Sequence, residues 1–293
     1  MTSCLQRLII ATLCWVWCIS ATAATTLPPW QLPFDRTDWY QQWLPGQLLD
    51  PLAPYVESSC SNPIQIWIPP HEAHDNFYAA LLDDWQSHPL SEFTPCLQVK
   101  RYPTADLDCA IEGVRQRQRC TLPLLPSEAG SQHIVFRGSF IASVDPRVLM
   151  LPERADVMLM AHEIGHWLGL VDEYAMSPSI ARNFCTGRYR GDSLNVVVTE
   201  REVLSALELQ TLWAELPWRD AVSSWEQLGV VQSDGRWRLG TRNSQQVGLH
   251  SINTCAHAEG YAWRPVGYFT AMQYHDTNRW PELYLELIRR AQQ

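Results

Sequence analysis

The segment Ala161–Tyr174, AHEIGHWLGLVDEY, contains the pattern H-E-x-x-H and constrains the fold more than any other part of the sequence. On a helix, His162 and His166 are four residues apart, so they lie on the same face, one turn from each other. Both imidazoles can then reach one metal ion. Glu163 lies one position further round the helix, where its carboxylate can hold a water molecule on the ion without binding the ion itself. The pattern therefore predicts a helix that carries a zinc site; the alternative is that these are ordinary core residues.

A third ligand is expected shortly after this helix, because a catalytic zinc ion usually has three protein ligands and one open position. Gly169 allows the chain to turn sharply away from the helix. Asp172 is then the expected third ligand, and a carboxylate oxygen is a competent zinc donor at about 2.0–2.2 Å. The neighbouring Glu173 is the alternative third ligand, with Asp172 as a polar residue at the helix end. The spacing of these residues favours a metal site over a chance H-E-x-x-H.

The spacing H-E-x-x-H-x-x-G-x-x-D resembles that of the metzincin metallopeptidases, whose third ligand is usually histidine and in some branches aspartate. Metzincins also have a methionine in a tight turn beneath the metal. The segment Thr270–Tyr274, TAMQY, is similar to that turn. The resemblance implies Met272 as the turn residue and Tyr274 as a switchable fifth ligand or a hydrogen-bond donor to the oxyanion. The alternatives are Met272 as an ordinary core residue and Tyr274 without contact to the metal.

Three further features are similar to the secreted IgA-peptidase-type metallopeptidases of bacteria. They are H-E-x-G-H at residues 162–166, D-E-Y at 172–174 and the pair Arg264-Pro265 before the methionine turn. The present sequence has one residue fewer between the second histidine and the aspartate than those enzymes. It also lacks the cysteine and the arginine that flank their methionine.

This similarity covers about residues 155–175 and 258–280. It implies an α/β (α+β) fold of the metzincin type, with a twisted mixed sheet, a central zinc-binding helix and a C-terminal part that carries the methionine turn. Relative to compact members of the family, the chain has an insertion at about residues 176–258.

The predicted domain organisation has three parts. Residues 1–23 contain a basic residue, an apolar run and the small-residue cleavage site Ala21-Thr22-Ala23, which is typical of a signal peptide; a retained anchor is the alternative. Residues 24–60 are rich in proline and tryptophan, which indicates an extended surface segment or a pro-segment that is removed on activation. Residues 61–293 are expected to form the metallopeptidase catalytic domain.

The cysteines also indicate export. Removal of the signal peptide leaves six of the nine cysteines, and an even number is typical of disulfides in an exported protein. The simplest pairs are Cys109 with Cys120, which closes a local loop, and Cys185 with Cys255, which ties down the chain after the zinc helix. We therefore expect the protein to be secreted or periplasmic.

The charge distribution restricts the partners. The net charge is −9 and no basic cluster is visible, which argues against a nucleic-acid partner. No apolar run after the signal peptide reaches the roughly 18 residues of a transmembrane helix, so no membrane association is expected after cleavage. The expected partner is a protein or peptide substrate.

The periodicity of apolar residues predicts the main elements. Helices are expected at residues 73–87, 152–168, 199–216 and 281–291. The third of these begins at the capping-box pattern Thr199–Glu202. Strands are expected at residues 63–68, 133–137 and 139–144, and a hairpin at 230–239.

Together these features predict an exported zinc-dependent endopeptidase, with Zn²⁺ held by His162, His166 and Asp172. Glu163 is expected to act as general base on a metal-activated water, and Tyr274 to stabilise the oxyanion. Two alternatives are a zinc-stabilised binding protein without turnover and a periplasmic zinc hydrolase of cell-wall peptides. The presence of Glu163 argues against the first alternative, because a purely structural zinc site does not need this carboxylate.

Overall fold

The computed structural model describes residues 50–56, 63–102, 107–112, 117–122, 130–138, 141–187 and 193–293. The expected signal peptide, most of segment 24–60 and Cys60 lie outside these residues. Residues 50–293 belong to one compact unit, which includes the short helix α3 (Ala53–Val56) ahead of the expected domain start. No helix in the described ranges combines the length and the apolar character needed to cross a membrane.

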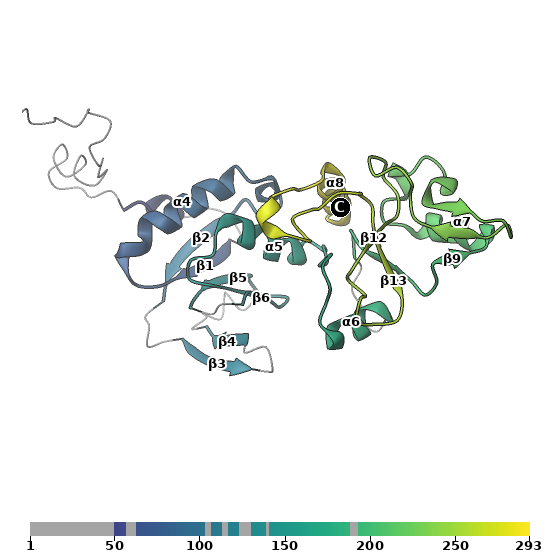
Figure 1. Ribbon diagram of the computed structural model, residues 1–293. Coiled ribbons are helices and arrows are strands. Elements are labelled where there is room, and N and C mark those ends of the chain that lie inside the picture. Colours follow the sequence, from purple (N-terminus) through teal and green to yellow (C-terminus); the bar gives the residue numbers. More distant parts are fainter. Residues whose placement is uncertain are drawn as a thin grey trace, which may run out of the picture. The chain divides into compact units, whose positions relative to one another are not determined.

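A five-stranded mixed sheet is built by the first part of this unit (Figure 1). Its strands, in spatial order, are β2 (Leu97–Arg101), β1 (Ile64–Ile68), β5 (His133–Phe136), β7 (Val148–Leu151) and β6 (Ser143–Val144). The first four are parallel to their neighbours, and β6 runs antiparallel at the edge. The predicted α+β class and the mixed sheet are therefore confirmed.

The central strands of this sheet are buried on both faces, as is usual for parallel strands. One face packs against α4 (Asp75–Gln86) and α5 (Val157–Trp167) through alternate residues such as Ile66, Ile134 and Leu149. The other face forms a second cluster with Trp67, Val135 and Met150. This cluster includes the cysteines of the hairpin β3 (Asp108–Glu112) and β4 (Arg117–Thr121), which lies across the sheet from α4 in Figure 1. The predicted Cys109–Cys120 disulfide joins the two hairpin strands.

Helix α5, which carries the candidate ligands His162 and His166, is shorter at its start than the sequence predicts. Residues 148–151 form strand β7, and a turn follows in which the Ala155 amide donates to the carbonyl of Pro152 (3.0 Å). Asp156 then caps the helix, because its Oδ1 accepts the Leu159 amide (2.9 Å). The helix therefore begins at Val157 rather than at Pro152. No element is predicted at 148–151 from the sequence, and pairing with β5 makes this run a strand.

The capping box of the next long helix was assigned to the wrong residues. Helix α7 covers Ala206–Glu215, and its capping box is formed by Ser205 and Glu208. Thr199 instead ends strand β8 (Val197–Thr199), where its backbone pairs with β13 (Tyr261–Arg264). Of the strand predicted at 139–144, only residues 143–144 are extended within the described part, while 141–142 are not. Helix α4, the terminal helix α8 (Glu282–Ala291) and the predicted hairpin agree with the sequence analysis.

The region that the sequence marks as an insertion has a hydrophobic core of its own. It contains a three-stranded sheet of β10 (Gly229–Val231), β11 (Trp237–Leu239) and β9 (Val203–Leu204), and a second of β12 (His250–Ile252), β13 and β8. The fully buried Trp218 lies in this core. Because Trp263 of β13 and Leu287 of α8 belong to the same core, the region is packed against the C-terminal elements that follow it.

Candidate metal centre

Helix α5 supplies the two histidines of the centre. Both rings lie on the same face, with centroids 5.1 Å apart, and His162 is almost fully buried. His162 Nδ1 is hydrogen-bonded to the carbonyl of Ala271 (2.8 Å), and His166 Nδ1 to the carbonyl of Leu170 (2.9 Å). A carbonyl can only accept a hydrogen bond, so each Nδ1 must carry a proton. In the neutral rings the lone pairs are therefore on Nε2, which is the arrangement that a metal-binding histidine needs.

The chain turns back to the histidines directly after α5. Gly169 has a φ of 89°, in the left-handed region that favours glycine, and the Leu170 amide donates to the carbonyl of Gly165 (2.9 Å). This turn brings Asp172 Oδ1 to 3.1 Å from His162 Nε2 and 3.2 Å from His166 Nε2. The three residues that the sequence proposes as ligands therefore meet at one point.

The arrangement of these three donors fits a zinc ion. Tetrahedral zinc with donors at about 2.0–2.2 Å would hold neighbouring donor atoms about 3.3–3.5 Å apart, close to the spacings of 3.1 and 3.2 Å. With both rings neutral, Asp172 Oδ1 is a buried acceptor that faces two further lone pairs and has no donor. Such a group of lone pairs requires a cation among them, and one carboxylate with two imidazoles is a donor set that zinc accepts.

In the metal-free protein a proton can supply this positive charge. Burial disfavours the imidazolium, but the hydrogen bond and the negative charge of Asp172 outweigh burial and raise the pKa of His166 to about 9. Burial also disfavours the carboxylate, yet its contacts with the two histidines lower the pKa of Asp172 below its ordinary value. At neutral pH, His166 is therefore protonated and Asp172 ionised when no metal is bound.

Zinc binding should consequently release a proton. Because His166 must lose its proton before Nε2 can bind a metal, we expect about one proton per zinc at pH 7, and an affinity that rises about tenfold per pH unit until the pH approaches 9. Isothermal titration calorimetry in two buffers of different ionisation enthalpy measures the proton count. Zinc uptake at pH 7 without proton release would show that His166 is already neutral in the metal-free protein.

Glu173, the alternative third ligand, lies in a different environment. Its side chain is fully buried and accepts four hydrogen bonds from donors at 2.6–2.8 Å. We call this group the Glu173 cluster; its members are Glu173, Asn195, Arg264, Thr270 and Tyr284. Burial, together with the Glu173 charge, raises the pKa of the Tyr284 phenol, so the phenol stays protonated and donates. Both oxygens of the Glu173 carboxylate are therefore occupied by protein donors, which leaves none for a metal ion. The geometry favours Asp172 as the third ligand.

The Glu173 cluster also explains two features of the sequence pattern. Arg264, in the pair that precedes the methionine turn, donates to Glu173 Oε2 (2.8 Å), and Thr270, at the start of that turn, donates to the same atom (2.8 Å). The Glu173 amide in turn donates to the carbonyl of Met272 (3.0 Å). The D-E-Y segment and the distant turn are thus held together by a buried ion pair and by hydrogen bonds.

The turn at residues 270–274 lies against helix α5. Met272 is fully buried, and a Cβ atom added to Gly165 would come within 2.9 Å of the Met272 sulfur. Glycine at this position of α5 therefore allows the methionine to approach the helix one residue away from His166. The carbonyl of Ala271 also accepts from His162, so the turn contacts both α5 and a candidate ligand. Its role as a methionine turn stays a prediction.

The ring contacts of Tyr274 are not with the candidate metal ligands. Its ring is half exposed and packs edge-on against Phe269, with centroids 5.3 Å apart. The rings beside His162 are instead Tyr174, which stacks on it at 6.2 Å, and His275 at 6.3 Å. The role of Tyr274 remains a prediction. Tyr174 was not among the site residues expected from the sequence, although it lies only two residues after Asp172.

Glu163 is the remaining functional residue of the pattern. It follows His162 on α5 and is largely buried. Its charge contributes to the raised pKa of His166, after the larger effects of burial and of Asp172. A carboxylate thus lies next to the candidate metal ligands without being one of them.

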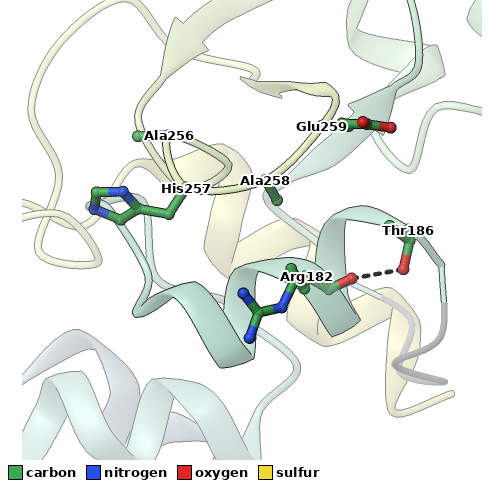
Figure 2. A pocket seen from close by; sticks show the side chains of 6 residues that line it. All are labelled: Arg182, Thr186, Ala256, His257, Ala258 and Glu259. Carbon is green, nitrogen blue, oxygen red and sulfur yellow. Dashed lines mark hydrogen bonds between the residues drawn. The ribbon is translucent and has the colours of Figure 1, made fainter.

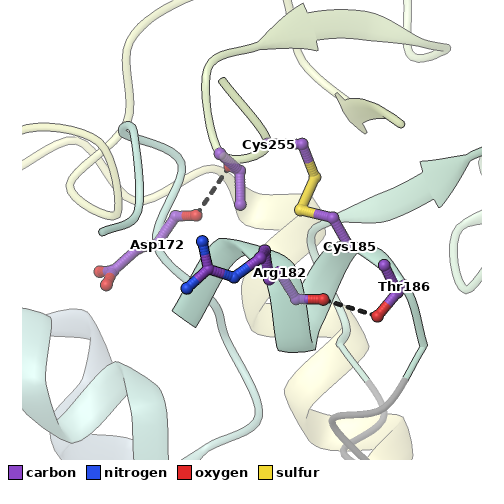
Figure 3. Close-up of a disulfide and its surroundings, with 6 residues drawn as sticks. Asp172, Arg182, Cys185, Thr186 and Cys255 are labelled. Carbon is purple, nitrogen blue, oxygen red and sulfur yellow. Dashed lines mark hydrogen bonds between the residues drawn. A yellow bond between two sulfur atoms is a disulfide. The ribbon is translucent and has the colours of Figure 1, made fainter. Parts of the chain in front are cut away.

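The loop before β13 also contacts the third ligand. Thr254 donates to the backbone carbonyl of Asp172 (2.9 Å), and its own carbonyl accepts the Met176 amide (3.3 Å). The next residue, Cys255, forms the predicted disulfide with Cys185 at the end of α6 (Pro178–Cys185), as Figure 3 shows.

Comparison of the chain with models of known protein families and with curated proteins found no match. Inferences about function therefore rest on this geometry.

Proposed function

We propose that this protein is an exported zinc-dependent endopeptidase of the metzincin type. The observation that carries the proposal is the convergence of His162 Nε2, His166 Nε2 and Asp172 Oδ1 at 3.1–3.2 Å, with Glu163 beside them. The support of the centre by a buried methionine turn agrees with this reading. The two disulfides within the described residues suit an oxidising compartment, as expected for an exported enzyme.

In this proposal the protein's own residues divide the work. His162, His166 and Asp172 hold the ion, which when bound lowers the pKa of water toward 7 and polarises the scissile carbonyl. Glu163 accepts a proton from the attacking water and delivers it to the departing amine. A phenol donates a hydrogen bond to the oxyanion as negative charge develops there: Tyr274 is the residue expected from the sequence, and Tyr174 is the one whose ring lies beside His162.

Removal of the metal tests this function. We expect the protein to cleave an unstructured protein such as casein, and a chelator to abolish cleavage because the three ligands alone provide no Lewis acid. Added zinc should restore cleavage after the chelator is removed by dialysis. Gel electrophoresis of the digests, with zinc content from atomic emission, gives both quantities.

The same experiment distinguishes the alternatives. A zinc-stabilised binding protein would retain zinc and cleave nothing. A hydrolase confined to cell-wall peptides would leave casein intact but release fragments from peptidoglycan. Either outcome would overturn the general endopeptidase.

A further inference from the structure

A surface pocket of about 530 Å³ lies between helix α6 and the loop that precedes β13 (Figure 2). Arg182 and Thr186 line it from the helix side. Residues 256–259 of the loop form the opposite wall. The pocket is therefore built by the two segments that the Cys185–Cys255 disulfide links.

Both walls are connected to the candidate metal centre. The loop wall begins at residue 256, directly after Thr254 and Cys255. The Thr254 hydroxyl donates to the backbone carbonyl of Asp172. Helix α6 begins six residues after Asp172 in sequence, and the Met176 amide between them is hydrogen-bonded to the Thr254 carbonyl. The pocket is therefore linked to the segment that carries Asp172 through the hydrogen bonds of Thr254.

Arg182 gives one end of the pocket a positive charge. Its guanidinium is exposed and has no ion-pair partner among the residues that the structure describes. In Figure 2 the guanidinium and the His257 ring extend to the same side, whereas the Glu259 carboxylate lies at the opposite side. Figure 3 shows the guanidinium extending from α6 toward the segment that carries Asp172. The guanidinium is therefore the cationic group of the pocket that extends toward the segment of the candidate ligand Asp172.

We propose that this pocket is a substrate subsite for a carboxylate side chain, so that the enzyme prefers peptides with aspartate or glutamate next to the scissile bond. This inference rests on the proposed peptidase function. A guanidinium binds a carboxylate through two parallel charge-assisted hydrogen bonds, which a lysine of the substrate cannot form with it and glutamine forms only weakly. The net charge of −9 opposes an acidic substrate only at long range, where salt screens it beyond about 8–10 Å. Direct contact with Arg182 therefore dominates.

The test uses the zinc-loaded protein and a set of fluorogenic peptides that differ only in carrying Glu, Gln or Lys at each position beside the scissile bond. At one position we expect kcat/KM for Glu to exceed that for Gln by about tenfold or more, as charge-assisted hydrogen bonds allow. Arg182→Gln should abolish this preference, and Arg182→Glu should reverse it in favour of Lys. Arg242→Gln, in the exposed loop between β11 and β12, is the matched control and should leave the preference unchanged.

Binding separates this inference from the proposed function. The same peptides are titrated against Glu163→Gln protein by fluorescence anisotropy. If the Glu peptide binds more tightly than the other two, and this difference depends on Arg182, the subsite is supported. If the parent protein at the same time hydrolyses none of the peptides, the peptidase function is overturned while the subsite stands. Hydrolysis or binding without such a preference would overturn the subsite alone. An equal loss for all three peptides in Arg182→Gln would assign Arg182 a structural role and would also overturn it.

Discussion

Replacing Glu163 by glutamine is expected to lower kcat for peptide hydrolysis by a factor of about 10²–10⁴ while zinc remains bound, because general base catalysis contributes an effect of that size. The side chain is largely buried beside His162 on α5, and glutamine has nearly the same volume. The substitution removes the proton acceptor and none of the three candidate ligands. Initial rates with a fluorogenic peptide, together with the zinc content of the same sample, provide the measurement.

Glu163→Asp is the informative companion variant. It keeps the carboxylate but withdraws it by one methylene group, so its rate should lie between those of the parent and Glu163→Gln. Equal losses in both variants would point to altered packing in α5. Parental activity in Glu163→Gln with zinc in place would eliminate the general-base role.

Replacing Glu173 by glutamine is expected to destabilise the protein by about 3–5 kcal/mol, the usual cost of breaking a buried ion pair. The substitution leaves the Arg264 guanidinium, whose side chain is 6% exposed, without its counter-charge. It also places an amide NH₂ where the carboxylate accepts from surrounding donors. Since domains are stable by only about 5–15 kcal/mol, the variant should lose a large part of its stability. Urea unfolding of the zinc-loaded protein measures the free energy of unfolding.

Two controls make this prediction specific. Glu215→Gln, an exposed change of the same chemistry at the end of α7, should alter stability by less than about 0.5 kcal/mol. Adding Arg264→Gln to Glu173→Gln should recover part of the loss, because no unpaired charge is then buried. A loss under about 1 kcal/mol in the single variant would show that the Glu173 cluster does little to stabilise the fold.

The parts of the fold that sequence analysis predicted well are those with a strong local pattern. Alternation gave β1, and the helical spacing of apolar residues gave α4 and α8. Its errors occurred where a distant partner decides between two locally reasonable structures. The run at 148–151, for which no element was predicted, is a strand because β5 pairs with it. Thr199, which was predicted to open a helix, is extended because β13 pairs with it.

The candidate site shows the same limit. The spacing of His162, His166 and Asp172 could be read directly, because one helix and one glycine turn determine it. The choice between Asp172 and Glu173 could not, since two adjacent carboxylates look alike in sequence. What separates them is Arg264, more than ninety positions later, which engages Glu173 in a buried ion pair.

The Glu173 cluster also sets the order in which the candidate metal centre can become complete. Its acceptors are filled by residues that follow Glu173 at separations of 22, 91, 97 and 111 positions. Helix α5, with both histidines, is synthesised long before Tyr284 exists. A growing chain therefore carries the histidines without the fixed carboxylate and without the turn that supports them. The three candidate ligands are therefore held in place only when the C-terminal part of the chain has folded onto the segment after α5.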